Sequence, residues 1–257
     1  MLFADDTALV AVSEEGLKRL VAEFGRVCVR RKLRVNVGKS KVMRCSREGE
    51  GDRMDVRLDG ELLEEVESFK YLGSHVAVNG RVDVEVSHRV KEASKCMGGM
   101  KSVMRNRALG MTAKRRLYEG VVVPTALYGA ETWNMREADR SRLDVFEMRC
   151  LRSMVGVTRL DRVRNEEVRR RTGMERKLSE RVDQRVLSWY GHVVRMDEER
   201  LTERVWKAEV SGVNLRGRPR RGWMEGVERA LGMRGLSVEQ GRESARDRRE
   251  WRDVVGG

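Results

Sequence analysis

Apolar residues recur at helical spacing shortly after the start of the chain. Ser13 is typical of a helix N-cap, and Glu14 and Glu15 suit the first turn, where carboxylates face the positive end of the helix dipole. The apolar positions that follow lie mostly three or four residues apart: Leu17, Leu20, Val21, Phe24, Val27 and Cys28. This spacing predicts a helix that buries one face in a core.

The pattern then changes to strand-like alternation up to about residue 80. Apolar and polar residues alternate in several stretches, and two of these end at Asp-Gly or Asn-Gly pairs typical of tight turns. The stretches are Leu33–Val37 with a continuation over 41–45, Met54–Leu58 before Asp59-Gly60, and 66–78 before Asn79-Gly80. Residues 1–80 therefore predict an α+β layer, in which one helix packs on antiparallel strands.

From about residue 82 the apolar spacing becomes helical and stays so to the end of the chain. We expect Thr112 to cap a helix that stops at Pro124, because proline interrupts the hydrogen bonds of a helix. The predicted helices cover 84–104, 112–123, 140–155, 162–171, 178–196, 199–210, 222–231 and 237–253. The predicted fold class is α+β, with a mixed part at 1–80 and helical parts at 81–157 and 158–257.

Charge adds a candidate partner to this picture. The 257 residues carry a net charge of +13, and the pI is about 10.0. Arginine dominates the basic residues, and its planar guanidinium pairs well with phosphate, so a polyanion is the expected partner. An arginine-rich composition can also follow from a GC-rich gene, so charge by itself does not prove binding.

Cysteine and histidine positions argue against a zinc site. Four cysteines, Cys28, Cys45, Cys96 and Cys150, are widely scattered, lack C-x-x-C spacing, and have no cluster of histidines beside them. Free thiols are typical of an intracellular protein, and no apolar run is long enough to span a membrane. With no signal peptide visible, we expect a cytoplasmic or nuclear protein that is not secreted.

Two adjacent carboxylates, Asp5 and Asp6, lie between short apolar runs at the start of the chain. The pattern predicts a strand, a tight turn carrying the acids, and a second strand. Adjacent carboxylates repel each other, and Mg²⁺ offsets that repulsion because it prefers oxygen ligands and often binds one or two carboxylates plus substrate phosphates. The alternative is a solvated turn, which aspartate supports by bonding its own backbone.

A basic segment near the C-terminus reads L-R-G-R-P-R-R-G over residues 215–222. Glycine and proline keep such a segment extended, so we expect it to lie along phosphates, with a plain solvated linker as the alternative. The residues concerned are Arg216, Arg218, Arg220 and Arg221.

Large aromatic residues of the helical parts are predicted to pack between helices. A Trp-Tyr-Gly-His run could alternatively stack a base. The residues predicted to pack are Trp133, Trp189, Tyr190, Trp223 and Trp251.

Several short motifs follow one another in a specific order. The first three are Phe3-Ala4-Asp5-Asp6, Val35-Asn36-Val37-Gly38-Lys39-Ser40-Lys41 and Phe69-Lys70-Tyr71-Leu72-Gly73. The later ones are Leu127–Trp133, Trp189–Met196 and Gly217–Trp223. This succession closely resembles the palm and the C-terminal parts of reverse transcriptases from non-LTR (LINE-type) retrotransposons, nearly from end to end of the chain.

The resemblance implies a partial palm at 1–80, a helical thumb at 81–157 and a helical, basic C-terminal region at 158–257. Asp5, the stronger ligand, and Asp6 would hold Mg²⁺ or Mn²⁺, and Lys39 would lie near the phosphates of the incoming nucleotide. Lys41 and the four arginines of the basic segment would contact nucleic acid. The expected partners are an RNA template and an RNA–DNA duplex. The hairpin that positions the primer end would consist of Phe69, Lys70, Tyr71, Leu72 and Gly73.

Polymerisation in this family also needs fingers and a third carboxylate from an earlier strand, and here the chain begins just before Asp5. We therefore expect a truncated reverse transcriptase that does not polymerise by itself. One alternative is a non-enzymatic module that binds nucleic acid. The other is a helical interaction protein with no nucleic-acid role.

Overall fold

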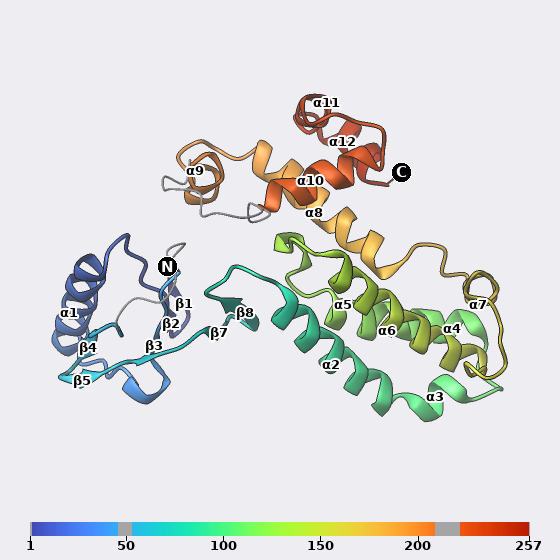
Figure 1. Ribbon diagram of the computed structural model, residues 1–257, viewed down its shortest axis with the longest axis horizontal. Coiled ribbons are helices and arrows are strands. Elements are labelled where there is room, and N and C mark those ends of the chain that lie inside the picture. Colours follow the sequence, from blue (N-terminus) through green and yellow to red (C-terminus); the bar gives the residue numbers. More distant parts are fainter. Residues whose placement is uncertain (1, 46–52, 209–221, 257) are drawn as a thin grey trace. The chain divides into compact units, whose positions relative to one another are not determined.

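The computed structural model describes residues 2–45, 53–208 and 222–256, and the chain divides into two compact units, 1–81 and 82–257 (Figure 1). The first unit is mixed and the second is helical, so the predicted α+β class is confirmed. Each unit is described by itself below.

The first unit combines one helix with short strand pairs. Helix α1 (Glu14–Arg30) begins at Ser13, whose Oγ accepts a hydrogen bond from the Gly16 N–H at 3.1 Å. Helix α1 packs against β4 (Arg57–Leu58), which forms a hairpin with β5 (Glu61–Leu62) through Asp59-Gly60. The predicted helix and this predicted hairpin are confirmed.

The described strands form two-stranded ladders and do not join into one sheet. The antiparallel ladders join β1 (Leu2–Phe3) to β2 (Asp6–Thr7), β4 to β5, and β7 (Ser68–Tyr71) to β8 (Ser74–Ala77). The remaining ladder joins β3 (Lys41–Val42) to β6 (Glu64–Glu65) in parallel. The expectation of antiparallel strands throughout is wrong at β3 and β6, because the segment between them is long enough for the crossover that a parallel pair needs.

The predicted strand at Leu33–Val37 is also wrong. Residues Val37–Lys39 form a 3₁₀ helix, and the Asn36 Oδ1 accepts a hydrogen bond from the Lys39 N–H at 3.1 Å. The asparagine side chain thus offers the backbone a turn in place of a ladder, which ends the extended segment before it can pair.

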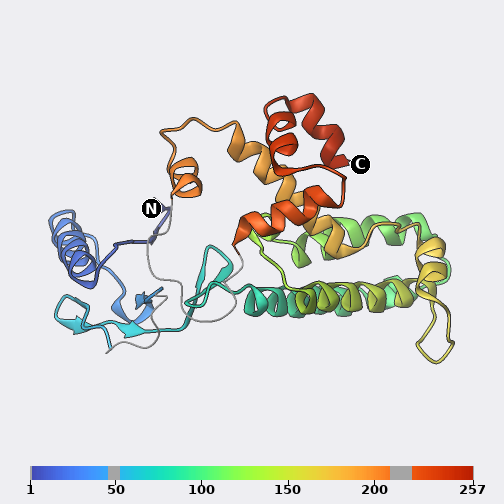
Figure 2. The same cartoon turned by 45° about the horizontal axis from the view of Figure 1, so that its top comes forward.

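The second unit contains the α-helices that follow residue 82. Helices α2 and α6 lie side by side, as Figure 2 shows from a tilted view. In chain order the helices are α2 (Asp83–Gly99), α3 (Lys101–Arg105), α4 (Met111–Leu117), α5 (Val123–Ala126), α6 (Glu137–Val155), α7 (Asn165–Thr172), α8 (Leu178–Val194), α9 (Leu201–Lys207), α10 (Trp223–Gly232), α11 (Val238–Ser244) and α12 (Arg248–Gly256).

Pro124 does not stop a helix, which corrects the prediction. A π-helical turn at Tyr118–Val122 leads directly into α5, and Pro124 occupies its first turn, where a missing N–H costs nothing. The Val123 N–H reaches back to the Tyr118 carbonyl, so the wider π turn accommodates the proline without ending the helical path. Gly110, and not Thr112, occupies the N-cap of the preceding helix α4.

Two other predicted helices are each divided in two. The predicted helix over 84–104 breaks at Met100, directly after Gly98 and Gly99, whose low helix propensity weakens the end of α2. The predicted helix over 237–253 is interrupted before α12. There the Asp247 Oδ1 accepts hydrogen bonds from the Arg249 and Glu250 N–H groups and starts a new helix.

Each unit has its own hydrophobic core. The core of the first unit consists of Val21, Val42, Met54, Val56, Leu58 and Leu63. The larger core of the second unit is centred on side chains less than 2 % exposed, among them Tyr118, Leu143, Leu151, Leu187 and Tyr190. None of the described helices combines the length and the apolar character needed to cross a bilayer.

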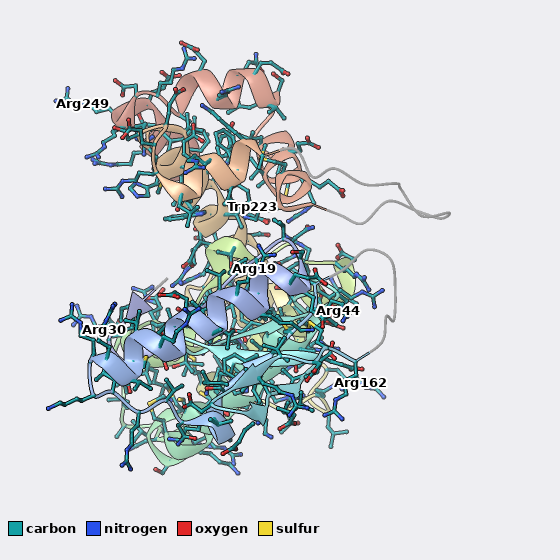
Figure 3. The ribbon with its side chains drawn as sticks, turned by 90° about the vertical axis from the view of Figure 1, so that its left-hand side faces the viewer. Arg19, Arg30, Arg44, Arg162, Trp223 and Arg249 are labelled. Atoms are coloured by element: carbon teal, nitrogen blue, oxygen red, sulfur yellow. The ribbon has the colours of Figure 1, made fainter. Side chains whose placement is uncertain are left out.

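Aromatic packing holds the C-terminal helices together. The Tyr190 ring lies 6.0 Å from Trp206, 6.4 Å from Trp223 (labelled in Figure 3) and 5.8 Å from Trp251, measured between ring centroids. The Trp251 Nε1 donates to the Leu187 carbonyl at 3.0 Å. Trp133 is also buried, so the predicted packing of Trp133, Tyr190, Trp223 and Trp251 is confirmed.

A glycine in α8 makes this close packing possible. A Cβ atom on Gly191 would overlap the indole ring of Trp251, which lies directly against the helix backbone. The Trp-Tyr-Gly-His run is therefore part of the core at Tyr190 and Gly191, whereas Trp189 is only partly buried and lies 5.3 Å from the His192 ring.

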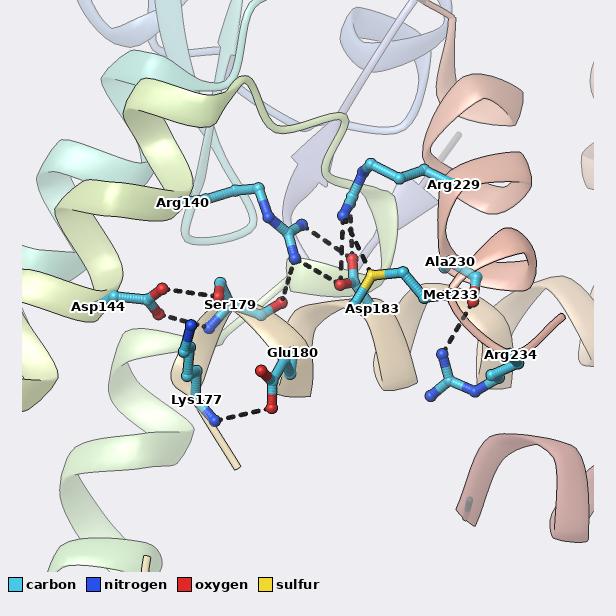
Figure 4. A network of polar contacts seen from close by, with 10 residues as sticks. All are labelled: Arg140, Asp144, Lys177, Ser179, Glu180, Asp183, Arg229, Ala230, Met233 and Arg234. Carbon is cyan, nitrogen blue, oxygen red and sulfur yellow. Dashed lines mark hydrogen bonds and ion pairs between the residues drawn. The ribbon is translucent and has the colours of Figure 1, made fainter. Parts of the chain in front are cut away.

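Ion pairs to the buried carboxylate of Asp183 join α6, α8 and α10 (Figure 4); the Arg140 partner is buried and the Arg229 partner is partly exposed. Asp183 of α8, which is 1 % exposed, accepts hydrogen bonds from Arg140 of α6 at 2.5 and 3.0 Å and from Arg229 of α10 at 2.7 Å. Asp144 of α6 accepts hydrogen bonds from the Ser179 N–H and Oγ at the start of α8. The positions of these helices thus depend on charges that are paired away from water.

We predict that Asp183→Asn destabilises the second unit. It leaves the buried guanidinium of Arg140 without a compensating charge, and breaking a buried pair costs about 3–5 kcal/mol. Urea unfolding followed by tryptophan fluorescence measures this unit, because all 5 tryptophans lie after residue 82. In the control, Glu243→Gln breaks the exposed pair with Arg246 and should change the free energy of unfolding by less than about 1 kcal/mol. Equal effects of the two substitutions would contradict the account.

Candidate functional site

The acidic pair lies on the first hairpin of the chain. Asp5 occupies the turn between β1 and β2, and Asp6 begins β2, where it pairs with Phe3. Ala4 adopts a left-handed φ of 51°, which tightens the turn. Both aspartates are exposed, so the hairpin presents two carboxylates to solvent.

This donor set suits a weakly held divalent cation. Mg²⁺ binds through one or two carboxylates and completes its shell with water and substrate phosphates, so two exposed aspartates fit the ion without enclosing it. Among the described residues no group of three or more His, Cys, Asp or Glu side chains is placed to hold a metal ion. The assignment of Asp5 and Asp6 as metal ligands stays a prediction.

The two lysines of the second motif differ in their surroundings. Lys39 ends the 3₁₀ helix and is exposed, and its backbone N–H is held by Asn36. The Lys41 Nζ lies 2.6 Å from the Glu64 Oε2 and donates to the Gly38 carbonyl at 3.0 Å. The hydrogen bond from Lys41 lowers the pKa of the Glu64 carboxyl, so the charge of Lys41 is compensated within the protein. Lys39 is therefore the better placed of the two for an external phosphate.

The proposed primer-end residues form the β7–β8 hairpin. Leu72 and Gly73 make its two-residue turn with left-handed φ values of 47° and 83°, a conformation that glycine adopts freely. Phe69 and Tyr71 are half-buried, whereas Lys70 is exposed, in agreement with strand alternation. The hairpin exists as the resemblance implies, and its role at a primer end stays a prediction.

The predicted basic residues of the C-terminal segment, Arg216, Arg218, Arg220 and Arg221, lie outside the described residues. The structure instead reveals a different set of arginines around a cavity in the second unit. Sequence reasoning missed them, although Arg181 with Arg185 and Arg248 with Arg252 have the i, i+4 spacing that places side chains on one helix face.

Two buried titratable groups of the second unit, Cys150 and Glu147, have shifted pKa values. Burial raises the pKa of the Cys150 thiol to about 12, so the nucleophilic thiolate is disfavoured. Burial also raises the pKa of the Glu147 carboxyl, although Arg169 and the Leu178 N–H act in the opposite direction. The contacts of Glu147 join α6 to α7 and α8.

Comparisons with known proteins point to a mobile genetic element. The chain is 25% identical over 272 aligned residues to an uncharacterized transposon-derived protein of Caenorhabditis elegans, covering 98% of this chain and 93% of that protein. No protein-family model matches the chain, and no solved structure matches it. The similarity supports a transposable-element origin for the chain.

We predict that Mn²⁺ binds weakly at the acidic hairpin. As a paramagnetic ion it should broaden the amide NMR signals of residues 4–7 before those of other segments, because two carboxylates meet there. The double substitution Asp5→Asn with Asp6→Asn should remove this selective broadening. The matched control, Glu61→Gln with Asp55→Asn, neutralises two other exposed acids of the same unit and should leave it intact. Broadening that persists after loss of both aspartates would contradict the assignment.

Proposed function

We propose that the chain derives from the reverse transcriptase of a non-LTR retrotransposon and that its retained activity is binding of an RNA–DNA duplex. The observation that carries this proposal is the similarity to a transposon-derived protein along 98% of the chain. The order of the motifs, with an acidic hairpin first and a basic helical unit last, supports the more specific assignment.

The chemistry of the two units fits separate roles. In the first unit the exposed carboxylates of Asp5 and Asp6 can bind a divalent cation, and Lys39 can bind phosphate. When bound, Mg²⁺ would activate the attacking oxygen and stabilise the leaving one in nucleotidyl transfer. In the second unit, arginine-bearing helices can bind a duplex through its phosphates without reading its sequence.

We expect no polymerase activity from this chain by itself. Two-metal transfer needs a further carboxylate beside the acidic pair, and the described residues place no third acid there. Duplex binding requires only the basic surface, so it can persist without polymerisation.

The test is equilibrium binding of a labelled RNA–DNA duplex to the purified chain across a salt series. We expect log K to fall linearly with log salt concentration, because phosphate contacts release counterions. Asp5→Ala should bind as tightly as the unaltered chain. The absence of binding at low salt would contradict the proposal and indicate that the positive charge reflects composition and not a binding surface.

The same samples serve for primer extension with nucleoside triphosphates and Mg²⁺ or Mn²⁺. Template-dependent synthesis should not exceed that of the Asp5→Ala variant. Synthesis above that control would show that the chain is an active polymerase.

A further inference from the structure

A cavity of about 940 Å³ lies in the second unit, lined by residues of α5, of the segment before α8, of α8 and its C-terminal end, and of α12. Six arginines line it, against a single acid, Glu175. We call this feature the arginine groove, and its arginines are Arg176, Arg181, Arg185, Arg195, Arg248 and Arg252. A cleft lined by one sign of charge focuses the electric field and attracts counter-ions.

Three of these arginines are held in place by the protein. The Arg185 Nη1 donates to the Leu127 carbonyl at 2.6 Å, and the Arg181 Nη2 lies 3.2 Å from the Glu119 Oε1. Arg176 donates to the Gly256 carbonyl at the end of α12. A guanidinium carries five N–H donors, so one such bond orients Arg185 and leaves donors for a ligand. These contacts give the groove a rigid basic wall.

The remaining arginines carry charge that the described residues compensate only in part. Arg195 donates to the Ala245 carbonyl, yet its Nε is buried and meets no hydrogen-bond partner in the described part of the chain. Burial and the nearby Arg248 lower the pKa of Arg195, and Asp247 only partly opposes them. The Asp247 Oδ1 already accepts hydrogen bonds from the first N–H groups of α12. An added anion would relieve this repulsion.

Capping of helix ends explains only some of the arginines in the groove. Arg176 and Arg185 satisfy carbonyls at the C-terminal ends of α12 and α5, and such capping is a common structural use of arginine. Arg248 and Arg252 cap no helix end among the residues that the structure describes. They lie one helical turn apart on α12, are exposed, and form no ion pair with any described residue. These two residues therefore indicate an external ligand.

We propose that the arginine groove binds the phosphate backbone of a nucleic-acid duplex. This inference rests on the proposed function and locates it in α8 and α12. Arginine forks pair with phosphate oxygens in a bidentate manner, and several arginines along one groove suit a repeating polyanion. Among the described residues of the lining, Trp251 is the one aromatic side chain, and it is 3 % exposed and bound into the core, so these residues offer no platform on which a single strand could stack.

The test compares two double charge reversals in the same segment of the full chain. Arg248→Glu with Arg252→Glu alters the groove, whereas Arg246→Glu with Arg249→Glu (Arg249 is labelled in Figure 3) changes the net charge equally at exposed positions outside the groove lining. We expect the groove variant to bind an RNA–DNA duplex about tenfold or more weakly than the control variant. The slope of log K against log salt concentration should become shallower by the amount expected for the loss of about two phosphate contacts.

The outcomes separate the groove from the proposed function. An equal loss of duplex affinity in both variants would overturn the assignment to the groove and leave general electrostatic binding intact. No duplex binding by the unaltered chain would overturn the proposed function and the groove assignment together. Circular dichroism checks folding, and the milder Arg248→Gln with Arg252→Gln should show a smaller loss in the same direction.

A further arm replaces the duplex with inorganic tripolyphosphate, which presents the same chemistry without a repeating backbone. The duplex should bind at least about tenfold more tightly, because it contacts more phosphates. Tripolyphosphate binding as tight as that of the duplex, and lost in the groove variant, would assign the groove to a small polyphosphate and overturn the proposal.

Discussion

One buried carboxylate, Asp183, determines how the helical unit is arranged. It accepts charge-assisted hydrogen bonds from Arg140 of α6 and Arg229 of α10, and its own helix, α8, also carries Tyr190, against which the tryptophans of α9, α10 and α12 pack. Charges removed from water are tolerated only when they are paired with good geometry, so each of the three helices is confined to the position that satisfies Asp183. The aromatic packing and the arginine groove both depend on α8 being held there.

Arginine serves several structural and chemical purposes in this unit. Arg140 neutralises a buried acid, Arg185 donates to one carbonyl at the end of a short helix, and Arg248 and Arg252 line a cavity. The guanidinium suits all of these because it stays charged and offers several donors in a fixed plane. The described arginines of this unit therefore include some that pair with acids or cap helices and others that do neither, and we assign the latter to ligand binding.

Local signals in the sequence predicted local structure well. Helix α1 follows from its serine cap and apolar spacing, and the hairpin at Asp59-Gly60 follows from its turn residues. The acidic hairpin could be predicted for the same reason, since Asp5 and Asp6 lie within one short turn. The continuation of the helix through Pro124 could not be predicted, because the π turn that accommodates the proline leaves no periodic signal in the sequence.

The arginine groove could not have been found from the sequence, because its walls come from segments between residues 123 and 256 that only tertiary packing brings together. The measurement that tests it most directly is phenylglyoxal modification of arginines, followed by mass spectrometry, with and without an RNA–DNA duplex. The account predicts that the duplex protects Arg248 and Arg252 while Arg249 and Arg246 react as before. Equal protection of all four, or protection of none, would contradict it.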